Sequence, residues 1–381
     1  MLSSRVQTIL NEGILNNIYA GASVLVFKGG KEIIYAEAGC KTKETGEALN
    51  RETIHRIYSN SKPITAAAAM VLVERGLLDM QAPVAEFLPG FKNQQFYEEG
   101  KLRPVPAPAT VASLFSMTSG LVYPGTADSS ERQMETLFEE YEKAPVSTYD
   151  FCNRMGQIPL PFAPGASWRY GVSADVLGAV IEVVSGKTFA DFLDEALFKP
   201  LEMKDTGFYV KKENAHRLAT VYEWDKEKRL IPYTGRNLAV GGLYETLPPF
   251  HSGGAGLVST IDDYMRFAQM LLSKGSYKNE RILSPESVAF MIAPQLTAAQ
   301  QKAFWDLYEG YDYGHLMRMR TQKGQAFTLG NIGEYGWGGW LGTKFFNDPI
   351  QNLSFVFMTQ RKDTPEAPII NRLINAVYGA I

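Results

Sequence analysis

Hydrophobic residues near the start of the chain recur with the period of a helix. Between residues 6 and 18 they lie around one face, which predicts an amphipathic helix packed by that face. Residues 22–40 then read as two strands joined at Gly29-Gly30, because glycine tolerates the positive φ of a tight hairpin. The chain is therefore predicted to begin with a helix followed by an antiparallel pair of strands.

An Ala-rich segment, residues 61–75, predicts the clearest helix of the chain. Pro63 stands where a first turn tolerates proline, and Gly76 ends the pattern. The other predicted helices begin at cap residues or follow a glycine turn, and they lie within residues 111–121, 173–186, 188–203, 251–275 and 367–381.

The last hundred residues are mostly strand-like before the final helix. The predicted strand segments are residues 310–320, 325–331, 342–349 and 353–360. Strands at both ends of the chain around a helical middle predict one sheet that the C-terminal half completes, with a helical lobe inserted.

Composition excludes several classes of protein. The 381 residues are 45% hydrophobic and 21% charged, which is typical of a globular chain and not of a disordered or collagenous one. The 38 Lys and Arg against 41 Asp and Glu give a net charge of −3, without a basic block, so nucleic acid is not an expected partner.

Cysteine usage and hydropathy bear on the compartment. Cys40 and Cys152 are too few for a disulfide framework or a four-thiolate zinc site, which favours a reducing compartment. The N-terminus lacks the pattern of a signal peptide, and no apolar run reaches the length of a membrane span. We therefore expect a cytoplasmic protein without a membrane partner.

Several cofactor and metal signatures are absent from the sequence. It contains no G-x-x-x-x-G-K-[ST], no G-x-G-x-x-G that opens a helix after a strand, no H-E-x-x-H and no G-x-S-x-G elbow. The four histidines, which are not spaced as a ligand pair, are expected in the core or on the surface: His55, His216, His251 and His315. We predict no cofactor and no metal.

One string carries chemistry: Ser59-Asn60-Ser61-Lys62, an S-x-x-K at the mouth of the predicted helix 61–75. Chance alone supplies roughly one such match in a chain of this length. Its placement adds weight, because residues three apart share a helical face and set the Lys62 amine beside the Ser59 hydroxyl, while a helix N-terminus offers donors to an oxyanion. On this motif alone, an N-capping serine beside a solvated lysine remains the alternative.

Five segments in order resemble the serine β-lactamase-related superfamily. This group contains class C β-lactamases, DD-carboxypeptidases, family VIII carboxylesterases, D-amino-acid amidases and some acyltransferases. The similarity covers nearly the whole chain and is far more specific than one S-x-x-K. The segments are IYSNSKPITAAAAMVLVERGLLDM, SLFSMTSGL, WRYGVSADVLGAVIEVVSGKTFADFL, HSGGAGLVSTIDDYMRFAQML and YGWGGWLGTKFFNDP.

The resemblance implies a fold and catalytic roles. The fold would be the α/β (α+β) type of β-lactamases and DD-peptidases, an antiparallel sheet flanked by the terminal helices plus an inserted, mainly helical lobe. Ser59 resembles the acylated nucleophile, Lys62 its partner and Tyr170 the tyrosine of the second motif. Trp340 matches the residue whose backbone N–H joins that of Ser59 in the oxyanion hole. Approximate domain boundaries are residues 1–75 with 240–381 for the sheet domain and 76–239 for the lobe.

Two departures from the family pattern bear on the subclass. Val172 stands where class C enzymes have the asparagine of Y-x-N, and Trp337-Gly338-Gly339 stands where β-lactamases carry K-T-G. The W-G-G segment therefore lacks the lysine that would pair with a substrate carboxylate. Neutral esters have no carboxylate, so their binding does not depend on that lysine. W-G-G is the form that family VIII esterases show.

The predicted function is a serine hydrolase that acts through an acyl-Ser59 intermediate, foremost a carboxylesterase on small acyl esters. The alternatives are a β-lactamase, DD-peptidase or D-amino-acid amidase, and further an acyltransferase. The partner is a small ester or amide, and the sequence leaves open the oligomeric state and whether Lys62 or Tyr170 is the base. The candidates for substrate binding are the W-G-G residues Trp337, Gly338 and Gly339 and the aromatic residues Tyr123, Trp168 and Trp340. Aromatic residues of the core would look the same in the sequence.

Overall fold

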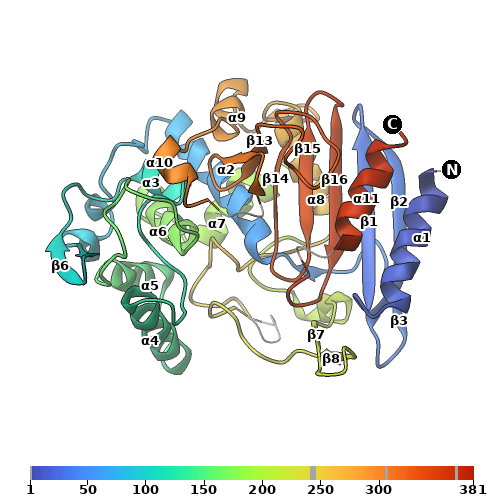
Figure 1. The fold of residues 1–381 in the computed structure, drawn as a ribbon, viewed down its shortest axis with the longest axis horizontal. Helices are drawn as coiled ribbons and strands as arrows, with labels where there is room; N and C mark the ends of the chain where they lie inside the picture. The colour runs from blue at the N-terminus through green and yellow to red at the C-terminus, as the bar shows by residue number, and fades with distance from the viewer. Residues whose placement is uncertain (1, 241–245, 305–307, 365–367) are drawn as a thin grey trace.

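One antiparallel sheet of eight strands organises the protein, in the order β12-β13-β14-β15-β16-β1-β2-β3 (Figure 1). The computed structural model describes residues 2–240, 246–304, 308–364 and 368–381. The strands are β1 (Gly21–Lys28), β2 (Lys31–Thr42), β3 (Glu47–Ala48), β12 (Tyr311–Tyr313), β13 (Arg318–Arg320), β14 (Tyr335–Gly338), β15 (Lys344–Asp348) and β16 (Leu353–Thr359). This confirms the predicted sheet that the C-terminal half completes.

The first and last strands of the sequence meet at the centre of the sheet. Strand β1 pairs with β16, with Val24 opposite Phe357, and β1 and β2 form the predicted hairpin. Gly29 and Gly30 have φ values of 58° and 72°, which glycine adopts without strain. Local turn chemistry therefore sets the hairpin, whereas the β1–β16 pair joins segments more than three hundred residues apart.

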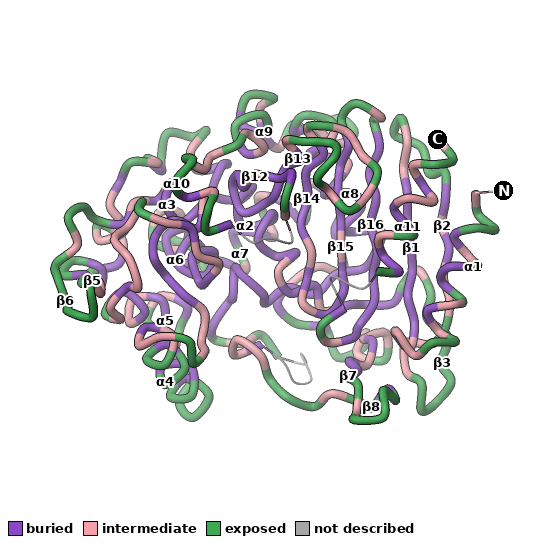
Figure 2. Tube along the Cα trace, viewed as in Figure 1, coloured by how far each residue is buried: buried purple, intermediate pink, exposed green. Residues whose placement is uncertain are grey.

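The two terminal helices, α1 (Leu2–Leu15) and α11 (Pro368–Tyr378), lie together on one face of the sheet (Figure 1). Leu10 of α1 and Leu373 of α11 are fully buried in a cluster with Phe355 of β16. Helix α8 (Ile261–Leu272) packs against the opposite face. The sheet is thus covered on both faces, and its central strands are buried along their length (Figure 2).

Helix α2 (Ser61–Glu74) lies at the centre of the molecule, between the sheet and the helical part of the chain (Figure 1). Its residues from Ser61 to Leu72 are all buried, which is expected of a helix that is apolar all round. The small side chains of its alanines let α6 pack closely against it. The helical part comprises α3 (Val111–Phe115), α4 (Ser129–Lys143), α5 (Thr148–Met155), α6 (Ser173–Ser185) and α7 (Phe189–Leu193).

Short elements complete the described structure. The small sheets pair β4 (His55–Arg56) with β9 (Val258–Ser259), β5 (Gln95–Glu98) with β6 (Lys101–Pro104), β7 (Tyr222–Trp224) with β8 (Leu230–Pro232), and β10 (Ser276–Tyr277) with β11 (Glu280–Arg281). The remaining helices are η1 (Tyr58–Asn60), η2 (Val84–Glu86), η3 (Pro89–Phe91), η4 (Asp194–Phe198), η5 (Lys212–Arg217), α9 (Pro285–Met291) and α10 (Ala298–Gln301).

Residues 310–320, predicted as one strand segment, form the antiparallel strands β12 and β13 with a turn between them. Two other predicted segments also differ in the structure. Residues 325–331 form no strand, because the backbone and side chain of Thr328 accept hydrogen bonds from the buried Arg320 instead of a ladder partner. Helix 188–203 begins at its predicted cap, Thr188, but continues after α7 as the π-helical η4. Both differences arise from hydrogen bonds that periodicity does not reveal.

Candidate active site

Ser59 lies on η1, the short turn that leads directly into α2. The Lys62 Nζ, one turn further on, donates a hydrogen bond to the Ser59 Oγ at 3.2 Å. Ser59 is partly exposed, whereas Lys62 is fully buried. The N-cap of α2 is Asn60, so the alternative of a capping serine beside a solvated lysine does not describe this site.

The Lys62 amine has three polar neighbours. Besides Ser59, its Nζ donates to the Tyr123 Oη at 2.7 Å and to the Gly254 backbone oxygen at 2.8 Å. Burial lowers the pKa of Lys62 to about 7, although the nearby Asp175 carboxylate acts in the opposite direction. A neutral amine then has two N–H groups for Tyr123 and Gly254 and one lone pair for the Ser59 hydroxyl.

Asp175 is a member of this network that the sequence did not single out. It lies in the first turn of α6, and its carboxylate accepts hydrogen bonds from the Ser252 Oγ at 2.5 Å and the Gly254 N–H at 3.0 Å. Gly254 therefore connects Asp175 to Lys62 through one peptide backbone. A Cβ on Gly254 would lie 2.7 Å from the Asp175 Oδ2, which explains the glycine. In the sequence, the Gly-Gly pair in HSGGAG was the feature that could have indicated this close contact.

Tyr170 reaches Ser59 from the helical side of the site. Its hydroxyl is hydrogen-bonded to Ser59 and accepts a hydrogen bond from the Trp337 Nε1 at 3.0 Å. The Lys62 Nζ lies 4.6 Å from the centroid of the Tyr170 ring. Burial raises the pKa of Tyr170 despite the two hydrogen bonds, so the phenol keeps its proton at neutral pH.

The predicted substrate-binding aromatics occupy different positions. Tyr123 contacts the Lys62 amine, as described above. Trp168 and Trp337 are both 2% exposed, and each packs against the Tyr170 ring, so in this structure they support Tyr170. Tyr308, which sequence reasoning missed, is partly exposed and stacks on Trp337 with ring centroids 5.7 Å apart.

The W-G-G segment brings the end of β14 against the turn that holds Ser59. A Cβ on Gly339 would lie 2.3 Å from the Ile57 backbone oxygen, whereas one on Gly338 would meet its nearest neighbour at 3.5 Å. Trp340 follows in a turn closed by a hydrogen bond from Gly339 N to Thr343 O at 2.7 Å. Among the described residues, none accepts a hydrogen bond from the Trp340 backbone N–H.

Arg169, next to Tyr170 in the sequence, and Arg318, on β13, could offer a charge to a substrate carboxylate, but both have acidic partners. Arg169 pairs with Asp128 at 3.1 Å and with Glu131. Arg318 is buried, pairs with Glu334 at 3.2 Å and lies over a tyrosine ring. Neither charge is left for a substrate carboxylate.

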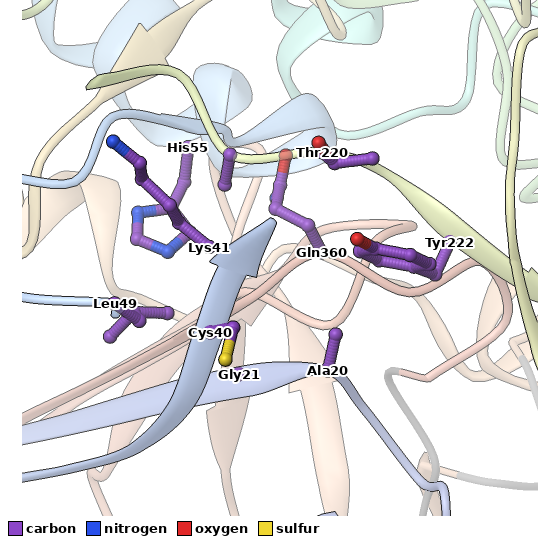
Figure 3. Close-up of a pocket in the computed structure, with 10 residues that line it drawn as sticks. Ala20, Gly21, Cys40, Lys41, Leu49, His55, Thr220, Tyr222 and Gln360 are labelled. Atoms are coloured by element: carbon purple, nitrogen blue, oxygen red, sulfur yellow. The ribbon is translucent and has the colours of Figure 1, made fainter. Parts of the chain in front are cut away.

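Two hollows lie outside the cluster of Ser59, Lys62 and Tyr170. The described residues contain no group of three or more His, Cys, Asp or Glu side chains that could hold a metal. A hollow of about 10 Å³ beside His55 is close to the size of one water molecule (Figure 3). Burial lowers the pKa of His55 to about 4, so this histidine is neutral at pH 7. A larger groove, about 730 Å³, lies along α7 and residues 204–211.

Comparison with known proteins identifies the family of this chain. The family model described as Beta-lactamase matches residues 14–379. The chain belongs to the β-lactamase family. Protein Rv1367c of Mycobacterium tuberculosis is 30% identical over 93% of this chain and 88% of its own. Esterase EstB of Burkholderia gladioli is 27% identical over 99% of this chain and 95% of its own.

Solved structures agree with the fold. The structure of EstCE1, titled a hydrolase with promiscuous acyltransferase activity, is 26% identical, with a TM-score of 0.82, and the alignment covers 99% of this chain and 98% of EstCE1. The predicted α/β fold of β-lactamases and DD-peptidases is confirmed.

Proposed function

We propose that this serine hydrolase of the β-lactamase family is a carboxylesterase that acts on small, uncharged acyl esters. The observation that supports it most is the contact between the buried Lys62 amine and the Ser59 hydroxyl. A lysine whose pKa is about 7 is partly neutral at neutral pH and able to accept a proton. The similarity to Esterase EstB supports esters as the substrate class.

In the proposed first step, neutral Lys62 takes the Ser59 proton as Oγ attacks the ester carbonyl. The backbone N–H groups of Ser59 and Trp340 bind the resulting oxyanion, because Ser59 lies in the first turn of a helical segment, where N–H groups lack intrahelical partners. The C–O bond to the alcohol breaks, and the proton held by Lys62 passes through the Tyr170 hydroxyl to the leaving oxygen.

In the second step, water attacks the acyl-Ser59 ester. Lys62 accepts a proton from the water, and that proton returns to Ser59 as the carboxylic acid leaves. Both steps restore the starting protonation of the enzyme. An alcohol that replaced water would give acyl transfer, and the similarity to EstCE1, a hydrolase with promiscuous acyltransferase activity, favours that as the second candidate activity.

The loss of the K-T-G lysine and the pairing of two nearby arginines support uncharged substrates. Trp337 replaces the lysine of K-T-G, and Arg169 and Arg318 are already paired with carboxylates. A substrate carboxylate would lose hydration without gaining a partner. Tyr123, Tyr308 and Trp340 are the partly exposed aromatics that we propose for contact with the substrate.

A labelling experiment tests the proposal. A fluorophosphonate probe is expected to modify Ser59, mapped by mass spectrometry, and Ser59→Ala should abolish both labelling and hydrolysis of p-nitrophenyl butyrate. Ser130→Ala, which removes another buried serine hydroxyl, is the matched control and should keep both. Labelling of another serine, together with full activity in Ser59→Ala, would overturn the assignment.

Domain organisation and compartment remain proposals. We retain the division into residues 1–75 with 240–381 and residues 76–239. In the described part of the chain, every helix falls short of the length and apolarity needed to cross a membrane. The cytoplasm is proposed on the small number of cysteines.

A further inference from the structure

One buried hydroxyl holds both sides of the turn that carries Ser59. Thr343 is fully buried, and its Oγ1 donates a hydrogen bond to the Ile57 backbone oxygen at 3.1 Å. The Thr343 Oγ1 also accepts a hydrogen bond from the Asn60 Nδ2 at 3.0 Å. Ile57 and Asn60 flank Tyr58 and Ser59 in the sequence, so Thr343 fixes the turn before and after the nucleophile.

Thr343 also closes the turn that presents Trp340. Its backbone oxygen accepts the hydrogen bond from the Gly339 N–H at 2.7 Å, and the Gly342 N–H bonds to the Gly339 oxygen at 2.9 Å. Trp340 lies inside this short turn. Thr343 therefore belongs to one turn through its backbone and to the other through its side chain.

The Ser59 turn needs such an external restraint. Tyr58 has a φ of 42°, in the left-handed region that residues other than glycine seldom occupy. Its side chain is buried against the Trp340 ring, with centroids 5.1 Å apart. A strained backbone keeps its conformation only where the surrounding contacts over-determine it.

We propose that Thr343 is a positioning residue that sets the spacing between the two oxyanion donors, the N–H groups of Ser59 and Trp340. The inference rests on the proposed function, because it assumes that these two donors stabilise the tetrahedral intermediate. Such donors act only when both lie within about 2.7–3.1 Å of the developing oxyanion. A small displacement of one turn against the other lowers the rate without removing a reacting group.

Thr343→Val tests this positioning role, because it keeps the side-chain shape and removes the two hydrogen bonds of the hydroxyl, with Ile57 and with Asn60. We expect kcat for p-nitrophenyl butyrate to fall about 10-fold to 100-fold with little change in KM, since donor geometry matters in the transition state. The rate of Ser59 phosphonylation should fall in parallel. Thr343→Ser keeps the hydroxyl and should return kcat to near the parental value.

Thr359→Val is the matched control. Thr359 is equally buried, and its hydroxyl donates to the Gly21 backbone oxygen at 2.7 Å on a central strand pair. It should lower the melting temperature comparably and leave kcat of the folded protein unchanged. Equal kcat losses in Thr359→Val and Thr343→Val, or parental kcat and phosphonylation in Thr343→Val, would overturn the proposal.

Two further outcomes are assigned in advance. If Thr343→Val does not fold, Asn60→Ala removes the hydrogen bond between Asn60 and the Thr343 hydroxyl. A parental kcat in Asn60→Ala then overturns the inference. If the parent protein neither hydrolyses esters nor reacts with the probe at Ser59, the proposed function fails. Ester hydrolysis by the parent with an unaffected Thr343→Val separates failure of this inference from failure of the function.

Discussion

The environment of Lys62 changes the protonation of its amine. The sequence placed its amine beside Ser59 by helical spacing, but spacing does not reveal burial. The structure surrounds the amine with Tyr123, Gly254 and the more distant Asp175 carboxylate, and burial outweighs that carboxylate in setting the pKa. The sequence left open whether Lys62 or Tyr170 is the base. Burial lowers the pKa of Lys62 and raises the pKa of Tyr170, and this difference favours Lys62 as the base.

A pH profile tests Lys62 as the base. The neutral amine is the active form, so kcat/KM for an uncharged ester should be lost as the pH falls through about 7 and be retained above it. Asp175 favours the ammonium form, so Asp175→Asn should move the inflection to lower pH. Asp263→Asn, a change at a buried carboxylate on α8, is the control that should not move it. An inflection that moves upward in Asp175→Asn would contradict this account.

Tyr170 can be tested with a matched pair of tyrosines. Tyr170→Phe should lower kcat by about 10²-fold or more with a similar melting temperature, because positioned acid–base groups contribute on that scale. Tyr313 lies in the same aromatic cluster, and its buried hydroxyl has no hydrogen-bond partner among the described residues. Tyr313→Phe should therefore keep the parental kcat. Parental turnover in Tyr170→Phe would remove Tyr170 from the mechanism.

At the scale of elements, predictions succeeded where the signal is local. The glycine hairpin, the Ala-rich α2 and the Thr188 cap of α7 follow from turn chemistry, propensity and capping, which nearby residues determine. The prediction of a strand at residues 325–331 was wrong, because the buried Arg320, on β13, donates hydrogen bonds to the backbone and side chain of Thr328. Tertiary contacts override local preference there.

Candidate site residues divide in the same way. Ser59 and Lys62 are three residues apart, so their contact follows from helical geometry. Tyr170 and Trp340 came from the resemblance to a family, because no local pattern links them to Ser59. Asp175 and Thr343 were missed, since each acts through backbone groups of residues far away in the sequence.

At the scale of the whole molecule, the fold joins three distant segments at one site. The η1 turn before α2 brings the nucleophile, the segment that leads into α6 brings Tyr170 and its first turn brings Asp175, and the end of β14 brings the W-G-G turn. This arrangement also places Trp337, in the position of the K-T-G lysine, beside Tyr170. We therefore expect the choice of substrate charge to depend on how the end of β14 meets the helical part.

Substrate charge gives the last prediction. Penicillins and cephalosporins bring a carboxylate into the cleft, and burying it without a partner costs about 1–3 kcal/mol or more. Arg169 and Arg318 do not offset this cost, because Asp128, Glu131 and Glu334 already neutralise them. We expect poor or no hydrolysis of β-lactams beside ready turnover of uncharged short-chain esters. Measured side by side on the purified protein, a kcat/KM for nitrocefin equal to or above that for p-nitrophenyl butyrate would exclude the esterase proposal and favour a β-lactamase.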